Sequence, residues 1–180
     1  SGVITAAVVL ILIGAMAKSA IMPFHFWLPA AMAAPTPTSA YLHAAAMVKA
    51  GVYLVARLAP GIPDIAAWRW MVLIGGIGTL LLGGYRALKQ NDLKLVLAFG
   101  TVSQLGLIML MVGYGTSAML LAGLGMLVAH SMFKSTLFLA VGQVDWATGT
   151  RDLRELSGLG RQMPITAAAA GLAGLSMMGF

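Results

Sequence analysis

The chain has 180 residues, of which 60% are hydrophobic and only 9% are charged, and its formal net charge is +6. This composition excludes an ordinary soluble domain and predicts an all-α polytopic membrane protein. Because the chain contains no cysteine, it holds no disulfide, thiolate metal site, Fe–S cluster or c-type haem. The basic residues are scattered at expected helix ends, which indicates membrane topology rather than nucleic-acid binding.

Apolar runs that approach about 20 residues predict about six membrane-spanning helices. The first runs from Val3 to Met22, and an amphipathic, partly helical piece from Pro23 to Ala34 follows it at the membrane interface. We expect the next four spans over residues 39–58, 65–85, 95–112 and 117–141, and a sixth that opens at Pro164. The third is rich in glycine, which lets neighbouring helices approach closely. A polar loop over 145–161, with a short helix at 152–156, connects the last two.

The ends of the chain lack the usual boundary signals of a complete membrane protein. There is no initiator Met and no charged region typical of a secretory signal, and the chain ends within an apolar run. We therefore expect residues 1–180 to be a single transmembrane segment of a larger protein, truncated at both ends.

Lys18 follows a long uncharged run and precedes Pro23 by five residues. A lysine at bilayer depth costs at least about 2.5 kcal/mol, so it is normally kept where it faces a polar cavity or a partner. Pro23 predicts a helix break, and breaks at membrane depth are used to build ion paths. The pattern indicates a protonatable site beside a broken helix. The alternative is that Lys18 reaches the membrane interface, beside an aromatic belt of Phe24, Phe26 and Trp27.

Lys49 lies in the middle of the second span, beyond easy reach of either interface, which favours a buried role. His43 precedes it by six residues, about 9 Å along a helix axis, so the two could serve successive positions on a hydrated path. His43 alone is equally compatible with a hydrogen-bonded packing role.

His130 and Lys134 are four residues apart and would share one face of the fifth span, with Ser131 and Ser135 in the adjacent row. An imidazole beside a buried ammonium is suited to a proton relay, because both groups can change charge at accessible cost. The alternative is a polar seam that holds helices together. No second histidine or carboxylate stands at ligand spacing, so no metal site is expected.

Carboxylates are absent from the predicted spans. All five lie in expected connections: Asp64, Asp92, Asp145, Asp152 and Glu155. The simplest role for Asp92 is to cap the fourth helix, in the polar turn that also contains Lys94. Buried lysines would then stay neutral in part, or take counter-charges from outside this chain.

The longest motif of the chain closely resembles one family of membrane proteins. The matching residues are Lys18-Ser19-Ala20 before Pro23, the run FWLPAAMAAPTPTSAYLH from Phe26 to His43, and MVKAGVYL from Met47 to Leu54. Asp92-Leu93-Lys94, Ser103 to Gly106 and His130 to Leu139 extend the resemblance. It is to the proton-conducting antiporter-like subunits, which include the large (A-type) subunit of Mrp-type Na⁺/H⁺ antiporters and membrane subunits of respiratory complex I and related hydrogenases.

Two short stretches separate the branches of this family. Leu95 and Phe99-Gly100 stand where many relatives have a basic residue and Tyr-Ser. These departures count more against complex I than against the superfamily. The motif Phe-His-Phe-Trp-Leu-Pro, from Phe24 to Pro29, favours a resemblance to the Mrp-type large subunit.

The resemblance implies a fold of inverted five-helix repeats, each with one broken helix, and this chain would match the second repeat from its broken first helix onward. It implies that Lys18 is the central lysine of that break and that His43 and Lys49 connect it to the relay. The outward relay would be His130 and Lys134. The glutamate that pairs with the central lysine would lie upstream, and a terminal lysine or glutamate would follow Phe180.

The resemblance further implies a multi-pass subunit of the bacterial cell membrane, not itself an enzyme and with no cofactor. It would translocate protons, and Na⁺ in exchange, together with other membrane subunits of a hetero-oligomeric antiporter. One alternative is an antiporter-like subunit of NADH:quinone oxidoreductase (complex I) or a related hydrogenase, without a redox site of its own. A second alternative is a non-conducting membrane scaffold whose lysines only hold helices together.

Overall fold

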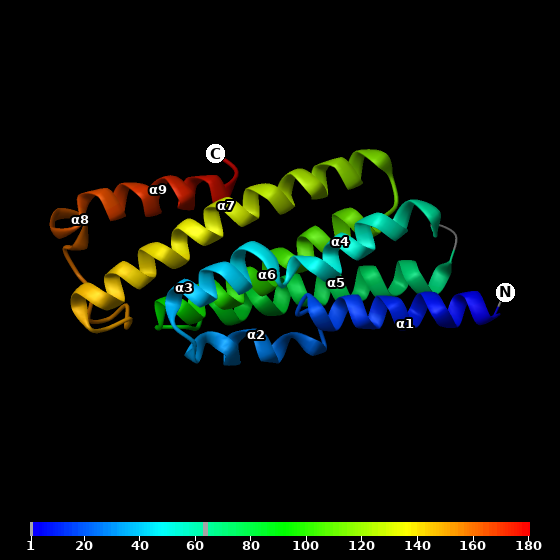
Figure 1. Cartoon of the computed structure of the whole chain (residues 1–180), viewed down its shortest axis with the longest axis horizontal. Helices are drawn as coiled ribbons and strands as arrows, with labels where there is room; N and C mark the ends of the chain where they lie inside the picture. The colour runs from blue at the N-terminus through cyan, green and yellow to red at the C-terminus, as the bar shows by residue number, and fades with distance from the viewer. Residues whose placement is uncertain (1, 63–64) are drawn as a thin grey trace.

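The computed structural model of the chain describes residues 2–62 and 65–180, and these fold into helices joined by turns (Figure 1). The longer helices are α1 (Gly2–Lys18), α4 (Lys49–Leu58), α5 (Ala66–Ala87), α6 (Leu93–Gly113), α7 (Ser117–Thr148) and α9 (Pro164–Met178). The shorter ones are η1 (Phe24–Phe26), α2 (Trp27–Ala30), η2 (Ala31–Ala33), α3 (Thr36–Ser39), η3 (Ala40–Ala46), η4 (Ala59–Gly61) and α8 (Leu159–Gln162).

Four helical stretches are long and apolar enough to cross a membrane: Thr36–Gly61, Ala66–Ala87, Leu93–Gly113 and Ser117–Thr148. The first of them joins α3, η3, α4 and η4. Two further apolar helices, α1 and α9, have 17 and 15 residues. The all-α polytopic class that the sequence predicts is confirmed, and each of the six expected apolar runs contains helix.

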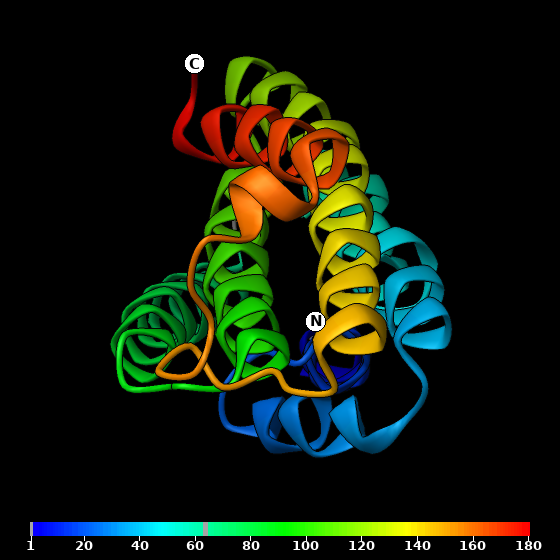
Figure 2. The same ribbon diagram turned by 90° about the vertical axis from the view of Figure 1, so that its left-hand side faces the viewer.

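The long helices run side by side as one elongated bundle. α5 packs along α6, α6 packs against α7, and α1 contacts both α4 and α5. Figures 1 and 2 show α9 against α7 on one side of the bundle, with α1 and α2 on the opposite side. The interior is filled by fully buried side chains, among them Leu12, Val52, Ile108 and Phe138.

The first span is shorter than predicted. α1 ends at Lys18, and Ala20 adopts a left-handed conformation with φ +54°. The N–H of Ser19 makes an ordinary helical bond to the carbonyl of Ala15 (3.0 Å). The N–H of Ile21 donates to the carbonyl of Met16, five residues back, at 2.9 Å, and with the left-handed Ala20 this is the six-to-one bond of the Schellman pattern that closes a helix. The predicted continuation to Met22 is therefore wrong: the capped end stops the helix before Pro23, which lies at the far end of the break.

The second span is not the uniform α-helix that the sequence predicts over 39–58. Its first half, η3, is π-helical, and the N–H of Met47 donates to the carbonyl of Leu42, five residues back, at 2.9 Å. Regular α-helix resumes only at Lys49. π-helical segments are rare and are found mostly at functional sites, and this one carries His43.

The fifth span is longer than predicted, because α7 continues to Thr148 and ends at Gly149 in the left-handed conformation. Asp145 therefore lies in the last turn of a helix and not in a loop. The short helix expected over 152–156 is also wrong. The side chain of Asp152 accepts the N–H of Arg154 at 2.9 Å and caps a turn there, and the short helix is α8, which begins at Leu159.

Candidate functional site

Three of the predicted site residues lie in the interior and close to one another. Lys49, at the start of α4, is 6% exposed, and His130 and Lys134, one turn apart on α7, are 0% and 1% exposed. His130 interacts electrostatically with both lysines. Packing of α7 against α4 and η3 thus brings Lys49 together with the pair on α7, which lies at least 81 positions later in the chain. We call these three residues the Lys–His cluster.

The two lysines of the cluster bond to backbone carbonyl groups. The Nζ of Lys49 donates to the carbonyl of Ala44 and, at 3.3 Å, to that of Ala45, both in the π-helical segment. The Nζ of Lys134 donates across to the carbonyl of Leu97 in α6 at 3.4 Å. Within residues 2–62 and 65–180, neither ammonium has a carboxylate at ion-pair distance. Among the described residues, the hydrogen-bond partners of both ammonium groups are backbone carbonyls.

His130 is the imidazole of the cluster and is fully buried. In the part of the chain that the structure describes, neither of its ring nitrogens has a hydrogen-bond partner. The ring packs edge-on against Phe133, with the centroids 5.5 Å apart and the planes at 78°. A neutral imidazole can accept a proton at one nitrogen and release one from the other, so His130 can pass a proton between positions on its two sides.

His43, in the π-helical segment, contacts a different set of residues from this cluster. It is buried, and its ring lies 6.0 Å from that of Trp27, measured between centroids. The Nε1 of Trp27 in turn donates to the carbonyl of Ala17, in the last turn of α1, at 3.1 Å. Trp27, expected as an interfacial aromatic, therefore connects the end of α1 with His43.

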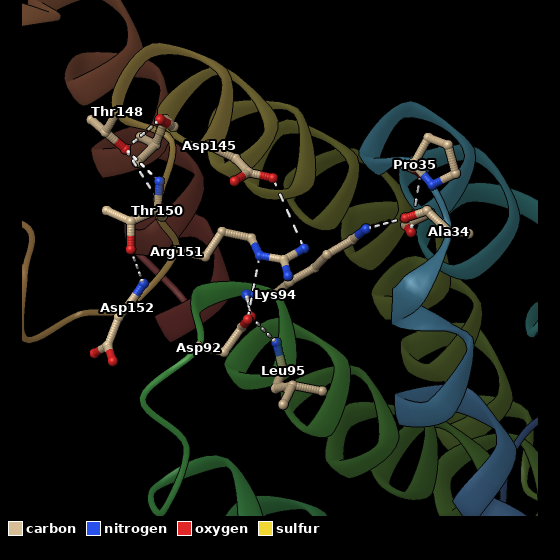
Figure 3. A network of polar contacts seen from close by, with 12 residues as sticks. Ala34, Pro35, Asp92, Lys94, Leu95, Asp145, Thr148, Thr150, Arg151 and Asp152 are labelled. Atoms are coloured by element: carbon tan, nitrogen blue, oxygen red, sulfur yellow. Dashed lines mark hydrogen bonds and ion pairs between the residues drawn. The ribbon is translucent and has the colours of Figure 1, made fainter.

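Lys94 is a buried cation that sequence reasoning missed. It is 1% exposed, and its Nζ donates to the carbonyl of Ala34, immediately before Pro35 (Figure 3). It also interacts electrostatically with His43. The Asp-Leu-Lys motif was the available signal, but a lysine in the first turn of a helix is typical of a solvated end. Here it is buried by tertiary packing against η2 and the Ala34 turn that follows it.

The carboxylates nearest to Lys94 belong to an ion-pair network at one end of α6 and α7 (Figure 3). Asp92 caps α6, as predicted: its Oδ1 accepts the N–H groups of Lys94 (2.7 Å) and Leu95 (3.1 Å). The guanidinium of Arg151 lies 3.3 Å from Asp92 and 3.9 Å from Asp145. Carboxylates thus stand beside Lys94 and not beside the Lys–His cluster. Asp64, also expected in a connection, lies outside the described residues.

Lys18 differs from the other predicted site residues because its side chain is exposed on this chain. It is the last residue of α1, where free carbonyl groups favour a positive charge. The expected burial at the break is not found within the described residues, and Pro23 is exposed as well. The neighbouring Ser19 is fully buried, so the backbone beside Lys18 enters the bundle while its side chain points away from it.

Asp152 and His25, which lie outside the spans, have displaced pKa values. Hydrogen bonds from Arg154 lower the pKa of the exposed Asp152 to about 2. Burial lowers the pKa of His25, and the positive charge of Arg86 lowers it further. This lowering favours the neutral form of His25, close to the break. Over the described ranges, no group of three or more His, Asp or Glu side chains is placed to hold a metal ion.

Comparison with known proteins gives the family of the chain. The profile described as "NADH:quinone oxidoreductase/Mrp antiporter, TM" matches residues 1–180. The chain is 52% identical to a probable K⁺/H⁺ antiporter A/B-type subunit of Rhizobium meliloti, over 95% of this chain and 17% of that protein. It is 49% identical to the A-type subunit of a Na⁺/H⁺ antiporter of Alkalihalophilus pseudofirmus, over 96% of this chain and 23% of that one.

Solved structures give the same result. The chain superposes on a chain of the Mrp complex from Dietzia sp. DQ12-45-1b with a TM-score of 0.90 and 45% identity, covering 96% of this chain and 19% of that one. A chain of the membrane-bound sulfane sulfur reductase, an archaeal respiratory membrane complex, gives 0.87 and 29%, covering 96% and 36%. The chain thus spans about a fifth of the length of the antiporter subunits it matches. It belongs to the NADH:quinone oxidoreductase/Mrp antiporter transmembrane family.

Proposed function

We propose that this chain is part of the proton path of a large, A-type subunit in a multisubunit cation/proton antiporter of the bacterial cell membrane. The observation that carries the proposal is the Lys–His cluster: Lys49, His130 and Lys134 are held together in the interior by different helices. Burying several cationic groups without carboxylate partners is costly, so membrane proteins keep them where charge has to move.

In the proposed path a proton passes from Lys18 to His43 or Lys49, and then through His130 and Lys134, with water between the sites. Two unit charges about 4 Å apart interact by about 4 kcal/mol at an effective dielectric constant of about 20. Protonation of one site therefore lowers the proton affinity of the next site by a free energy of this size. We add Lys94 to this path beside His43, because a positive charge on Lys94 would disfavour a positive charge on His43. Lys18 would face the rest of the longer protein, where a carboxylate could pair with it.

The relatives support the antiporter branch of the family over a redox-driven pump. The two relatives named above are antiporter subunits, and the chain would accordingly be a transporter subunit with no redox site of its own. We propose Na⁺ as the exchanged cation, with other membrane subunits completing the transport system. The Rhizobium meliloti relative is named for K⁺, so both ions have to be tested.

One observation favours the scaffold alternative. Each buried lysine donates a hydrogen bond to a backbone carbonyl: Lys49 to Ala44, Lys94 to Ala34 and Lys134 to Leu97. The bonds of Lys94 and Lys134 join separate helical segments and could hold the bundle together without any proton transfer. The proton path and the scaffold predict opposite results for variants that lose the charge of a buried lysine but still assemble. The proton path predicts reduced exchange, and the scaffold predicts normal exchange.

The experiment uses the full-length protein, produced with its partner subunits in everted vesicles of an antiporter-deficient host. Collapse of the pH gradient on addition of Na⁺ or K⁺ is followed for Lys49→Met and Lys134→Met, which keep side-chain length and lose the charge. Lys89→Met is the matched control, because Lys89 is exposed on the turn after α5.

We expect Lys134→Met to lower exchange by at least about tenfold, at the low end of what a positioned acid or base contributes, with normal amounts in the membrane. Lys89→Met should keep normal exchange. Full exchange by assembled Lys49→Met and Lys134→Met variants would refute the proton path and favour the scaffold.

A further inference from the structure

The break after α1 is held from outside by a buried threonine of α5. The N–H of Met22 donates to the Oγ1 of Thr79 at 2.7 Å, and the hydroxyl of Thr79 itself donates to the carbonyl of Gly75, one turn back in α5, at 2.5 Å. A hydroxyl has one hydrogen and two lone pairs. Because the hydrogen is used within α5, the lone pairs are directed at the break, and Thr79 is 0% exposed.

The other end of the same break is held by α4. Ser19 is also 0% exposed, and its Oγ accepts the N–H of Val52 at 3.0 Å. Val52 lies one turn after Lys49, where the α-helical ladder resumes beyond the π-helical segment. Figure 1 shows the end of α1 next to the start of α4. Two interrupted helices therefore meet at one hydroxyl, between Lys18 on one side and Lys49 on the other.

The contact at Ser19 requires an unusually close approach of the two helices. A Cβ atom on Gly51 would lie 2.0 Å from the carbonyl oxygen of Ala15 and 2.5 Å from the Oγ of Ser19. Only glycine fits there, so the spacing of α1 and α4 is set by backbone contact and not by flexible side chains. The break is thus attached firmly on both of its faces.

We propose that Ser19 and Thr79 are positioning residues, a break clamp that fixes the direction in which the end of α1 presents Lys18. Its significance for transport rests on the function proposed above. The clamp acts on the chain immediately after Lys18, at Ser19 and Met22, and touches no transported ion. Without it, the Met22 N–H or the Val52 N–H loses a partner, and the end of α1 can turn relative to α4 and α5.

The test measures the position of residue 18 directly. This chain has no cysteine, so Lys18→Cys introduces one thiol into it, in a full-length protein freed of other cysteines and assembled in the membrane. The rate of reaction of that thiol with a water-soluble maleimide is compared with and without Thr79→Val, which keeps the shape of Thr79 and removes its hydroxyl. Thr79→Ser restores the hydroxyl. Thr136→Val is the control, because the exposed Thr136 hydroxyl bonds only within α7.

We expect Thr79→Val to change the labelling rate about fivefold, the factor that corresponds to one net hydrogen bond. Thr79→Ser should return it to the starting value, and Thr136→Val should leave it unchanged. Ser19→Ala should act in the same direction as Thr79→Val. Its control is Ser39→Ala, another serine that is 0% exposed, whose hydroxyl bonds only within its own turn. Unchanged labelling in Thr79→Val and Ser19→Ala, with normal assembly, would overturn the proposal.

A second measurement separates this inference from the function it serves. With Lys18 intact, Thr79→Val should shift the pH profile of cation/proton exchange, and Thr79→Ser should restore the profile. A changed labelling rate with an unchanged pH profile would support the clamp and refute the role of Lys18 in transport. A changed profile with unchanged labelling would refute the clamp.

Discussion

Two adjacent glycines in α5 give the sharpest test of how closely α5 and α6 pack. A Cβ atom on Gly83 would lie 2.5 Å from the backbone nitrogen of Ser103, 2.8 Å from its Cα and 3.0 Å from the carbonyl oxygen of Phe99. All three are backbone atoms of α6, so no side chain can move aside. On Gly84 the nearest atom is the Oγ of Ser103 at 3.5 Å, an ordinary van der Waals contact.

The expected effect combines two terms. Replacing a glycine in a helix interior by alanine favours the helix by about 1 kcal/mol at either position, because the unfolded chain loses freedom. At Gly83 the overlap costs a further 1–3 kcal/mol, roughly what overpacking costs elsewhere. It also strains the hydrogen bond from Ser103 to the carbonyl of Leu80, which is 2.8 Å long. Gly83→Ala should therefore be less stable than Gly84→Ala by roughly 1–3 kcal/mol.

The assay compares the thermal unfolding midpoints of the two full-length variants in the same detergent, together with their amounts in the membrane. Gly84→Ala should match or exceed the unsubstituted protein, and Gly83→Ala should fall below both. Equal midpoints for the two variants would refute the backbone contact between α5 and α6.

Three further substitutions or conditions test single interactions. Asp92→Ala should lower the stability of the full-length protein by about 1 kcal/mol through loss of the α6 cap, while Asp92→Asn should lose less because an amide still caps; thermal melts measure both. A Cβ on Gly100 would lie 2.9 Å from the Nζ of Lys134, so Gly100→Ala should displace that ammonium and shift the pH profile of exchange without lowering protein abundance. The pKa of Asp152 is lowered to about 2 from 3.8, so its bonds to Arg154 should be complete above pH 3.8 and lost as the pH falls through about 2, as followed by hydrogen exchange of the Arg154 amide.

For each of these three predictions, one result would contradict the reasoning. Equal melts for the alanine and asparagine variants at position 92 would show that the cap contributes nothing. An unchanged pH profile for Gly100→Ala would place Lys134 away from that glycine or outside the path. Loss of protection of the Arg154 amide already near pH 4 would mean that the carboxylate of Asp152 is not held by the arginine.

The sequence by itself determined the class of the protein, its helices and most of their boundaries. Apolar runs and their flanking polar turns predict α5, α6 and the start of α7 to within two residues, because helix length and hydropathy are properties of a continuous stretch. Asp92 was predictable as a cap because it directly precedes the first residue of its own helix in the sequence. The burial of Lys49 and of the pair on α7 also followed, since no mid-span lysine can reach either surface.

The tertiary structure alone decided which charges face the interior and where helices are interrupted. Lys94 is buried because η2 packs against α6 and the following residue, Ala34, 60 residues earlier in the chain, accepts its hydrogen bond. The helix α7 keeps Asp145 in its last turn, while Arg151 folds back toward it. The end of α1 is a capped turn held by Ser19 and Thr79, although Pro23 is the only local signal of a break. In each case the deciding partner lies on another helix, so no pattern within the segment itself contains the information.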